Sequence, residues 1–209
     1  MSIRRASLLF RTAEDRELVE RAAGGDVEAY NVLVSRWEKR LYNYLLRTTG
    51  NREDALDLAQ EAFFKAYRSL STLGEAEKFP QWLFRIAHNL ACSKFRSDGR
   101  RPQAEPASWP EEGEVAAPAV TGAPVLLGSG PRVYPLELEL IVARALEDLS
   151  PDQREAVLLK VVHGFKFAEI AQILSCPLST VKSRIYAGFE QLKRALGEDV
   201  ATRAAFNRL

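Results

Sequence analysis

The residues with the clearest capacity for chemistry lie in one short stretch near the C-terminus, residues 167–186. The segment Ser175-Cys176-Pro177 interrupts a helical pattern there, because proline lacks the amide donor that a continuing helix needs. Apolar residues at three- and four-residue spacing flank this break and predict two packed helices, with the small Ala171 letting them approach closely. These apolar positions are Ile170, Ala171, Leu174, Val181, Ile185, Phe189 and Leu192.

The other face of the second helix carries hydroxyls and cations near its N-terminal end. Such side chains can reach phosphates and base edges, and this end of the second helix enters the major groove in helix-turn-helix proteins. The pattern therefore predicts a helix-turn-helix that binds double-stranded DNA, and the alternative is an ordinary helical hairpin with a solvated charged face. The candidate DNA-binding residues are Ser179, Thr180, Lys182, Ser183, Arg184 and Tyr186.

A second basic segment begins at Phe79 and runs to about Ser97. Basic and amide side chains mixed with aromatic ones suit unstacked, single-stranded DNA, and a solvated basic helix is the alternative. Gln81, Arg85, His88 and Asn89 are expected on the face opposite Trp82 and Ile86. The candidate DNA-binding residues of this segment are Arg85, Asn89, Lys94, Arg96, Arg100 and Arg101.

A third cluster is acidic and lies on the helix expected from Asn51 to Leu70. Carboxylates on the face away from the core would repel nucleic acid, so this face should meet a protein. An exposed Phe64 among them would serve as an interface anchor, unless it packs against a neighbouring helix. The face comprises Glu53, Asp57, Gln60, Glu61 and Phe64.

Metal and catalytic chemistry find little support in the sequence. His88 and Cys92 are four residues apart, but a structural zinc site usually has four ligands, so we expect a local polar contact. We find no phosphate-cradling glycine motif and no nucleophile signature. We therefore expect no enzymatic activity, no catalytic residue, no metal and no cofactor.

Composition limits the compartments and the classes of protein to which this sequence can belong. The 209 residues carry a net charge of +1, and the two cysteines, Cys92 and Cys176, fit a reducing compartment. No apolar run approaches the roughly 20 residues that span a bilayer, and the apolar stub within residues 1–11 is too short for a signal peptide. We expect a cytoplasmic protein without membrane insertion.

The elements that must position these clusters form two helical domains. Seven of the ten prolines lie in residues 102–135, which predicts a flexible linker rich in proline and glycine. The predicted fold is all-α, with domains at 12–101 and 136–197, the second a helix-turn-helix, and a C-terminal tail at 198–209. We see no alternating strand pattern of useful length.

In the first domain, Asp26 and Asn51 are expected to cap two helices, a loop is expected over residues 71–78, and a third helix follows. In the second, a helix begins near Leu136, Ser150-Pro151 starts another that ends at Gly164, and helices follow at 167–174 and 178–196. The expected core of the first domain is Tyr30, Leu33, Val34, Trp37, Leu41, Tyr44, Leu45, Ala55, Leu58, Ala59, Ala62, Phe63, Ala66, Tyr67, Leu70, Phe79, Trp82, Leu83, Ile86, Ala87 and Leu90.

Three segments resemble a known family. NREDALDLAQEAFFKAY at residues 51–67 and FPQWLFRIAHNL at residues 79–90 resemble region two of sigma factors. The segment from LSPDQREAV at residues 149–157 to Leu196 resembles region four. With no region one or three, the chain is similar to an extracytoplasmic-function sigma factor of the sigma-70 family.

That resemblance implies roles for the clusters. Residues 71–78 and the following helix with Asn89 would melt and read the single-stranded minus-ten element, and the helix from Leu178 would read the double-stranded minus-thirty-five element. The implied partners are core RNA polymerase and promoter DNA, with an anti-sigma factor as a further partner in many relatives. Residues implied to bind the clamp helices of polymerase are Leu56, Asp57, Gln60 and Glu61, to which the interface argument adds Phe64.

Two departures from the family and one alternative function stand beside this interpretation. Ala187 occupies a position where many relatives carry arginine, and residues 73–78 are more acidic than is usual. The alternative is a one-component helix-turn-helix regulator whose first domain senses a ligand or partner. Similar helix-turn-helix ends occur in response regulators, but those usually carry an α/β receiver, and the first half of this sequence shows no strand pattern and no phosphoacceptor pocket. A nucleic-acid-processing enzyme is the third, least supported class.

Overall fold

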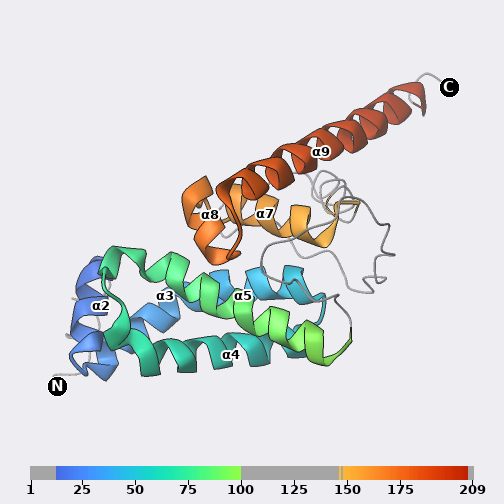
Figure 1. The fold of residues 1–209 in the computed structure, drawn as a ribbon. Coiled ribbons are helices and arrows are strands. Elements are labelled where there is room, and N and C mark those ends of the chain that lie inside the picture. The colour runs from blue at the N-terminus through green and yellow to red at the C-terminus, as the bar shows by residue number, and fades with distance from the viewer. Residues whose placement is uncertain (1–12, 100–145, 147, 207–209) are drawn as a thin grey trace. The chain divides into compact units, whose positions relative to one another are not determined.

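The computed structural model describes residues 13–99, 146 and 148–206, with side chains up to residue 195. All the regular secondary structure in these ranges is helical, which confirms the predicted all-α class (Figure 1). The chain divides into two compact units, Met1–Ala104 (unit 1) and Glu105–Leu209 (unit 2). The expected linker at 102–135, the helix start near Leu136 and the candidates Arg100 and Arg101 lie outside the described residues.

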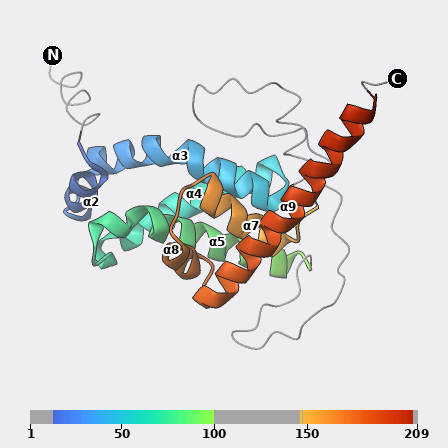
Figure 2. The same cartoon turned by 90° about the horizontal axis from the view of Figure 1, so that it is seen from above.

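Unit 1 is built on two long helices that pack along each other, α3 (Val27–Thr49) and α4 (Arg52–Ser69). Against them lie α2 (Asp15–Ala23) and α5 (Phe79–Ser97), as Figures 1 and 2 show. The expected loop between α4 and α5 contains two short 3-10 helices, η1 (Leu70–Thr72) and η2 (Ala76–Lys78), both packed on α2. This segment is therefore more ordered than a plain loop.

The predicted helix starts of unit 1 are confirmed. The side chain of Asp26 accepts a hydrogen bond from the amide of Ala29 at 3.1 Å. The side chain of Asn51 accepts from the amides of Glu53 and Asp54 at 2.8 and 3.2 Å. Each cap pairs amide donors that the first turn leaves without an intrahelical acceptor, so the sequence fixes where α3 and α4 begin.

The core of unit 1 is largely the predicted one, with exceptions that include Val34 on α3, which is only half-buried, and four side chains of α4 and α5. Phe84 is fully buried between Tyr44 and Trp37, with ring centroids 5.1 and 6.3 Å away, although its position falls outside the predicted stripe. Trp82 and Ile86 are only half-buried, because α5 contacts both α3 and α4 and so buries a different side of its surface from the one that the predicted stripe covers. Tyr67, expected in the core, is 42% exposed and packs on Tyr30.

Unit 2 contains α7 (Pro151–Val161), α8 (Phe167–Ile173) and α9 (Leu178–Phe206). Ser150 caps α7 in a capping box with Gln153, and Pro151 occupies the first turn, as predicted. The helix ends at Val161, and Gly164 turns the chain with φ +75°. The break between α8 and α9 is confirmed, and Ser175 adopts φ +51° there.

The packing of α9 differs from its predicted stripe. Val181 and Ile185 are buried as expected, but Phe189 is 39% exposed and Gly188 is buried in its place. A Cβ on Gly188 would lie 2.8 Å from Cγ2 of Val157, so the absence of a side chain lets α9 cross α7 closely. Beyond the predicted end near Leu196, α9 continues to Phe206, because Gly197 alone does not stop an alanine-rich helix without proline.

Candidate protein and nucleic-acid interfaces

The outer face of α4 carries apolar and acidic side chains in one stripe. Phe64 is 61% exposed and Leu56 is 51% exposed, so Phe64 does not pack into the core. The guanidinium of Arg68 lies 5.7 Å from the centroid of the Phe64 ring, and Lys65 pairs with Glu61 at 2.9 Å. Large exposed apolar groups among carboxylates are typical of a protein interface. All five candidates of this face are exposed: Leu56, Asp57, Gln60, Glu61 and Phe64.

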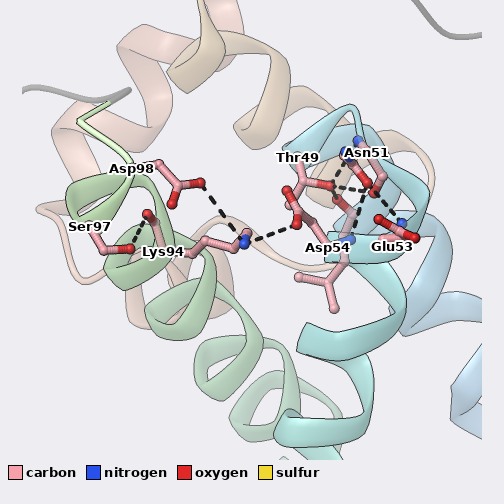
Figure 3. Close-up of polar contacts among 8 residues, drawn as sticks. Thr49, Asn51, Glu53, Asp54, Lys94, Ser97 and Asp98 are labelled. Carbon is pink, nitrogen blue, oxygen red and sulfur yellow. Dashed lines mark hydrogen bonds and ion pairs between the residues drawn. The ribbon is translucent and has the colours of Figure 1, made fainter.

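The candidates on α5 separate into two groups. Arg85 and Asn89 are exposed and one helical turn apart, so they share a face, and Arg96 is also exposed. Lys94 instead connects two helices: its ammonium lies 2.9 Å from Oδ1 of Asp54 on α4 and 4.0 Å from Oδ2 of Asp98 (Figure 3). The Asn51 cap fixes the first turn of α4, and this turn presents Asp54 to Lys94.

A shallow cleft of about 370 Å³ lies beside Lys94 between α4 and α5. It brings together side chains that the sequence assigned to different partners, namely the acidic face of α4 and the basic helix α5. Its lining residues are Asp57, Leu58, Glu61, Lys65, Leu90, Ser93, Lys94 and Ser97. The two candidate surfaces of unit 1 therefore adjoin each other at this cleft.

His88 and Cys92 make the local polar contact that their spacing predicts. Sγ of Cys92 lies 3.5 Å from Nε2 of His88. Within the described ranges, no group of three or more histidine, cysteine or acidic side chains is arranged to hold a metal ion. Nor does any helix of those ranges have the length and apolar character needed to cross a membrane.

The exposed face of α9 in unit 2 begins at its N-terminal turn and matches much of the predicted groove-facing set. Ser179, Lys182, Ser183 and Tyr186 are exposed, and Thr180 is half-buried. The Ser183 hydroxyl donates to the backbone carbonyl of Thr180 at 2.9 Å, so its oxygen still offers acceptor positions.

Tyr186 is supported from the side by α8. Its ring centroid lies 6.2 Å from that of Phe167, and the Lys160 ammonium lies 4.8 Å from the Phe167 centroid. The aromatic contact restricts where the Tyr186 ring can point, although the residue is 59% exposed. The phenol therefore lies at the outer face of α9 with one side of its ring against Phe167.

Arg184 lies apart from that face. Its Nη2 is 2.6 Å from Oδ2 of Asp152 on α7, and only 17% of its side chain is exposed. Its Nη1 approaches Sγ of Cys176, in the turn between α8 and α9, at 3.9 Å. Burial raises the pKa of the Cys176 thiol, which Arg184 lowers and Asp152 and Glu155 raise further. Asp152 and Asp54 are absent from the predicted sites, because no local signal shows which carboxylate meets a cation on another helix.

Comparison with known proteins agrees with this architecture. The family model "Sigma-70 region 2" matches residues 33–101, and "Sigma-70, region 4" matches residues 139–192. The ECF RNA polymerase sigma-E factor of Haemophilus influenzae is 35% identical over 187 residues, which cover 87% of this chain and 95% of the relative. The protein of the same name from Escherichia coli K12 is 37% identical over 180 residues, covering 85% and 92%.

Among solved structures, the chain is similar to the sigma factor RpoE of Bartonella quintana, which was crystallised with the anti-sigma factor NepR. The TM-score is 0.57 and the identity is 26%, over 80% of this chain and 96% of that chain. Two helical units, one of them a helix-turn-helix, together with these matches define the class: the chain belongs to the sigma-70 family. More particularly it is a sigma factor of the extracytoplasmic-function type, which directs transcription initiation by core RNA polymerase at promoter DNA.

Proposed function

We propose that the two units divide the work of initiation. The domain at residues 12–101 of unit 1 binds core polymerase through the outer face of α4 and melts the minus-ten element with α5. The domain at residues 136–197 of unit 2 reads the minus-thirty-five duplex with α9. The observation that carries this division is the contrast between the exposed face of α4, where Leu56 and Phe64 lie on the same face as Asp57 and Glu61, and that of α9, which combines Lys182 with hydroxyls.

The outer face of α4 is suited to a protein partner on physical grounds. Its carboxylates would repel phosphates, and the exposed Leu56 and Phe64 would gain apolar contact only against another protein. Asp57 and Glu61, one turn apart, offer acceptors for basic side chains of the polymerase. These features support α4 as the docking helix.

The face of α5 that carries Arg85 and Asn89 is suited to unpaired bases. An amide can pair with a base edge, and guanidinium groups can contact the backbone or stack on a base. Arg96 adds a positive charge further along the same helix. The acidic segment at residues 71–78, which includes η2, precedes this face and would lie close to the same DNA strand.

The chain itself is proposed to act without catalytic activity, in the cytoplasm, where core polymerase supplies the chemistry. An anti-sigma factor is a further proposed partner, supported by the related sigma factor of Bartonella quintana that was crystallised with one. The exposed apolar groups on α4 give such a protein a surface to cover. Occupying that surface would block polymerase binding by direct competition.

The decisive experiment is in vitro transcription with core polymerase, with and without the full chain, on fragmented genomic DNA with mapping of RNA 5′ ends. We expect new 5′ ends that appear only when the chain is present and that share upstream sequence elements. A one-component regulator would instead bind duplex DNA without polymerase and create no new start sites with core enzyme alone. That result would contradict the proposed mechanism.

A further inference from the structure

Arg184 joins three segments of unit 2. It lies on α9, pairs with Asp152 in the first turn of α7 at 2.6 Å, and approaches Sγ of Cys176 in the interhelical turn at 3.9 Å. Its side chain is 17% exposed and that of Asp152 is 35% exposed. Because the pair is partly shielded from solvent, salt screens it less than a fully exposed pair.

The geometry of α9 separates Arg184 from the groove-facing residues. At about 100° per residue, Arg184 lies roughly 200° from Lys182 and only about 60° from the buried Val181. Lys182, Ser183 and Tyr186 are exposed, whereas Arg184 is turned toward α7. One residue of the basic motif therefore faces the interior of unit 2.

Asp152 is well placed to hold this arginine. It belongs to the first turn of α7, where the helix dipole stabilises a carboxylate and where the Ser150–Gln153 capping box fixes the backbone. A short charge-assisted hydrogen bond from guanidinium to carboxylate is directional as well as strong. The pair therefore adds a directional polar contact between α9 and α7 to the apolar packing at their crossing.

We propose that Arg184 is a positioning residue, which through Asp152 sets the angle at which α9 presents Lys182, Ser183 and Tyr186 to promoter DNA. This inference rests on the proposed role of α9 in reading the minus-thirty-five element. Arg184 acts on recognition through α7 and does not bind the DNA itself. Sequence preference at the upstream element thus depends on an acidic residue outside the recognition helix.

A positioning role and a DNA-contact role predict opposite effects at Asp152. If Arg184 contacted DNA, Asp152→Asn would release it and remove a negative charge, so affinity for all DNA would rise. If Arg184 positions α9, Asp152→Asn and Arg184→Ala lower specific binding, while non-specific binding changes little. The dependence of affinity on salt also differs, because loss of a phosphate contact reduces the salt slope by about one.

The experiment uses holoenzyme assembled from the full chain and core polymerase. Its probes are an upstream duplex selected from a randomised pool by wild-type holoenzyme, and poly(dI-dC) as non-specific DNA. The variants are Arg184→Ala, Asp152→Asn, the double variant, and the exchange of Arg184→Asp with Asp152→Arg. Lys182→Ala is the matched contact control on the same helix. Thermal unfolding of each free chain is measured in parallel, and Asp152→Glu keeps the charge if the neutral variants unfold.

We expect Arg184→Ala and Asp152→Asn each to lower the ratio of specific to non-specific affinity by about tenfold, with unchanged salt slope. The double variant should be no worse than either one, and Asp152→Glu and the exchanged pair should regain much of the ratio. A loss of specific binding that only follows the loss of folded chain in thermal unfolding, and that neither Asp152→Glu nor the exchanged pair restores, would overturn the inference.

Two further outcomes separate this inference from the proposed function. Higher affinity for Asp152→Asn, or a reduced salt slope for Arg184→Ala, would overturn the positioning role while leaving α9 as the reader. Unchanged binding of the selected duplex by Lys182→Ala would instead overturn the assignment of α9 to the upstream element, and the inference with it.

Discussion

At the scale of single residues, two of the cations predicted to bind DNA prove to have acidic partners within their own unit. Lys94 pairs with Asp54 and Arg184 pairs with Asp152, each across two helices. Lys182, by contrast, projects from an exposed face. A cation on an amphipathic helix can therefore either pair with a carboxylate of a neighbouring helix or remain available for DNA, and its position around the helix axis decides between the two.

The ion pair between Lys94 and Asp54 gives a prediction about stability. We expect Lys94→Met to destabilise the chain by about 1–2 kcal/mol, because Asp54 is largely buried and would lose a charged partner. Urea unfolding of the full chain measures the change. The matched control is Arg96→Met, two residues along the same helix and exposed, which should change stability by less than about 0.5 kcal/mol. Equal losses for the two variants would contradict the proposed link between α4 and α5.

The acidic face of α4 gives a prediction about polymerase. Asp57→Ala combined with Gln60→Ala should weaken binding to core polymerase, while the unfolding temperature stays close to that of the wild type, because both side chains are exposed. A titration of labelled chain against core enzyme measures the affinity.

The control for the α4 face is Glu38→Ala with Lys39→Ala, an exposed pair on α3. We expect this pair to leave core binding unchanged. Equal affinity for the wild type and the Asp57/Gln60 variant would remove the face from the proposed interface.

At the scale of elements, the crossing of α7 and α9 depends on Gly188. Glycine inside a helix normally costs about 1 kcal/mol relative to alanine, so an alanine there would ordinarily stabilise the helix. Here the added Cβ would lie 2.8 Å from Cγ2 of Val157, a β-branched side chain with one strongly preferred rotamer in a helix. The steric cost should exceed the gain in propensity, because neither helix backbone can move without disturbing the core of unit 2.

We therefore predict that Gly188→Ala destabilises the chain by about 1–2 kcal/mol, as overpacking usually does. Thermal unfolding followed by circular dichroism measures the change. The double variant Gly188→Ala with Val157→Ala should lose less stability than the sum of the two single variants, because removing the Val157 methyl groups makes room for the new Cβ. Additive losses would show that the close contact does not limit the crossing.

At the scale of the whole molecule, the chain consists of two units with separate cores. Unit 1 is centred on aromatic residues such as Tyr44 and Phe84, and unit 2 on aliphatic ones such as Leu159 and Ile170. Because each unit buries its own core, a surface substitution in one should leave the fold of the other intact. Defects in upstream binding and in melting should therefore be separable by mutation.

That separation gives the last prediction. Lys182→Ala should weaken recruitment to a duplex upstream element and still permit RNA synthesis from a premelted bubble template. Asn89→Ala should spare upstream binding and impair open-complex formation, because its amide is proposed to pair with an unstacked base. Permanganate footprinting beside duplex-binding assays measures both steps. Normal melting by Asn89→Ala, together with failure of Lys182→Ala on the bubble, would reverse the assignment of the two units.

The sequence by itself determined the local features of this protein. These features are the caps at Asp26, Asn51 and Ser150, the break at Ser175-Cys176-Pro177 and most apolar stripes. Each depends on residues within about one helical turn of each other, so the order of residues along the chain is enough to predict it. The exposed face of α4 and much of that of α9 follow from the same periodicity.

Only the tertiary structure decided which helix lies opposite each face. The pairing of Lys94 with Asp54, that of Arg184 with Asp152 and the close contact at Gly188 each join residues on different helices. Helical periodicity gives the direction of a side chain around its own axis but not the neighbour that it meets. That neighbour is set by the packing of whole helices, and this packing turns Arg184 away from the face that its place in the basic motif had suggested.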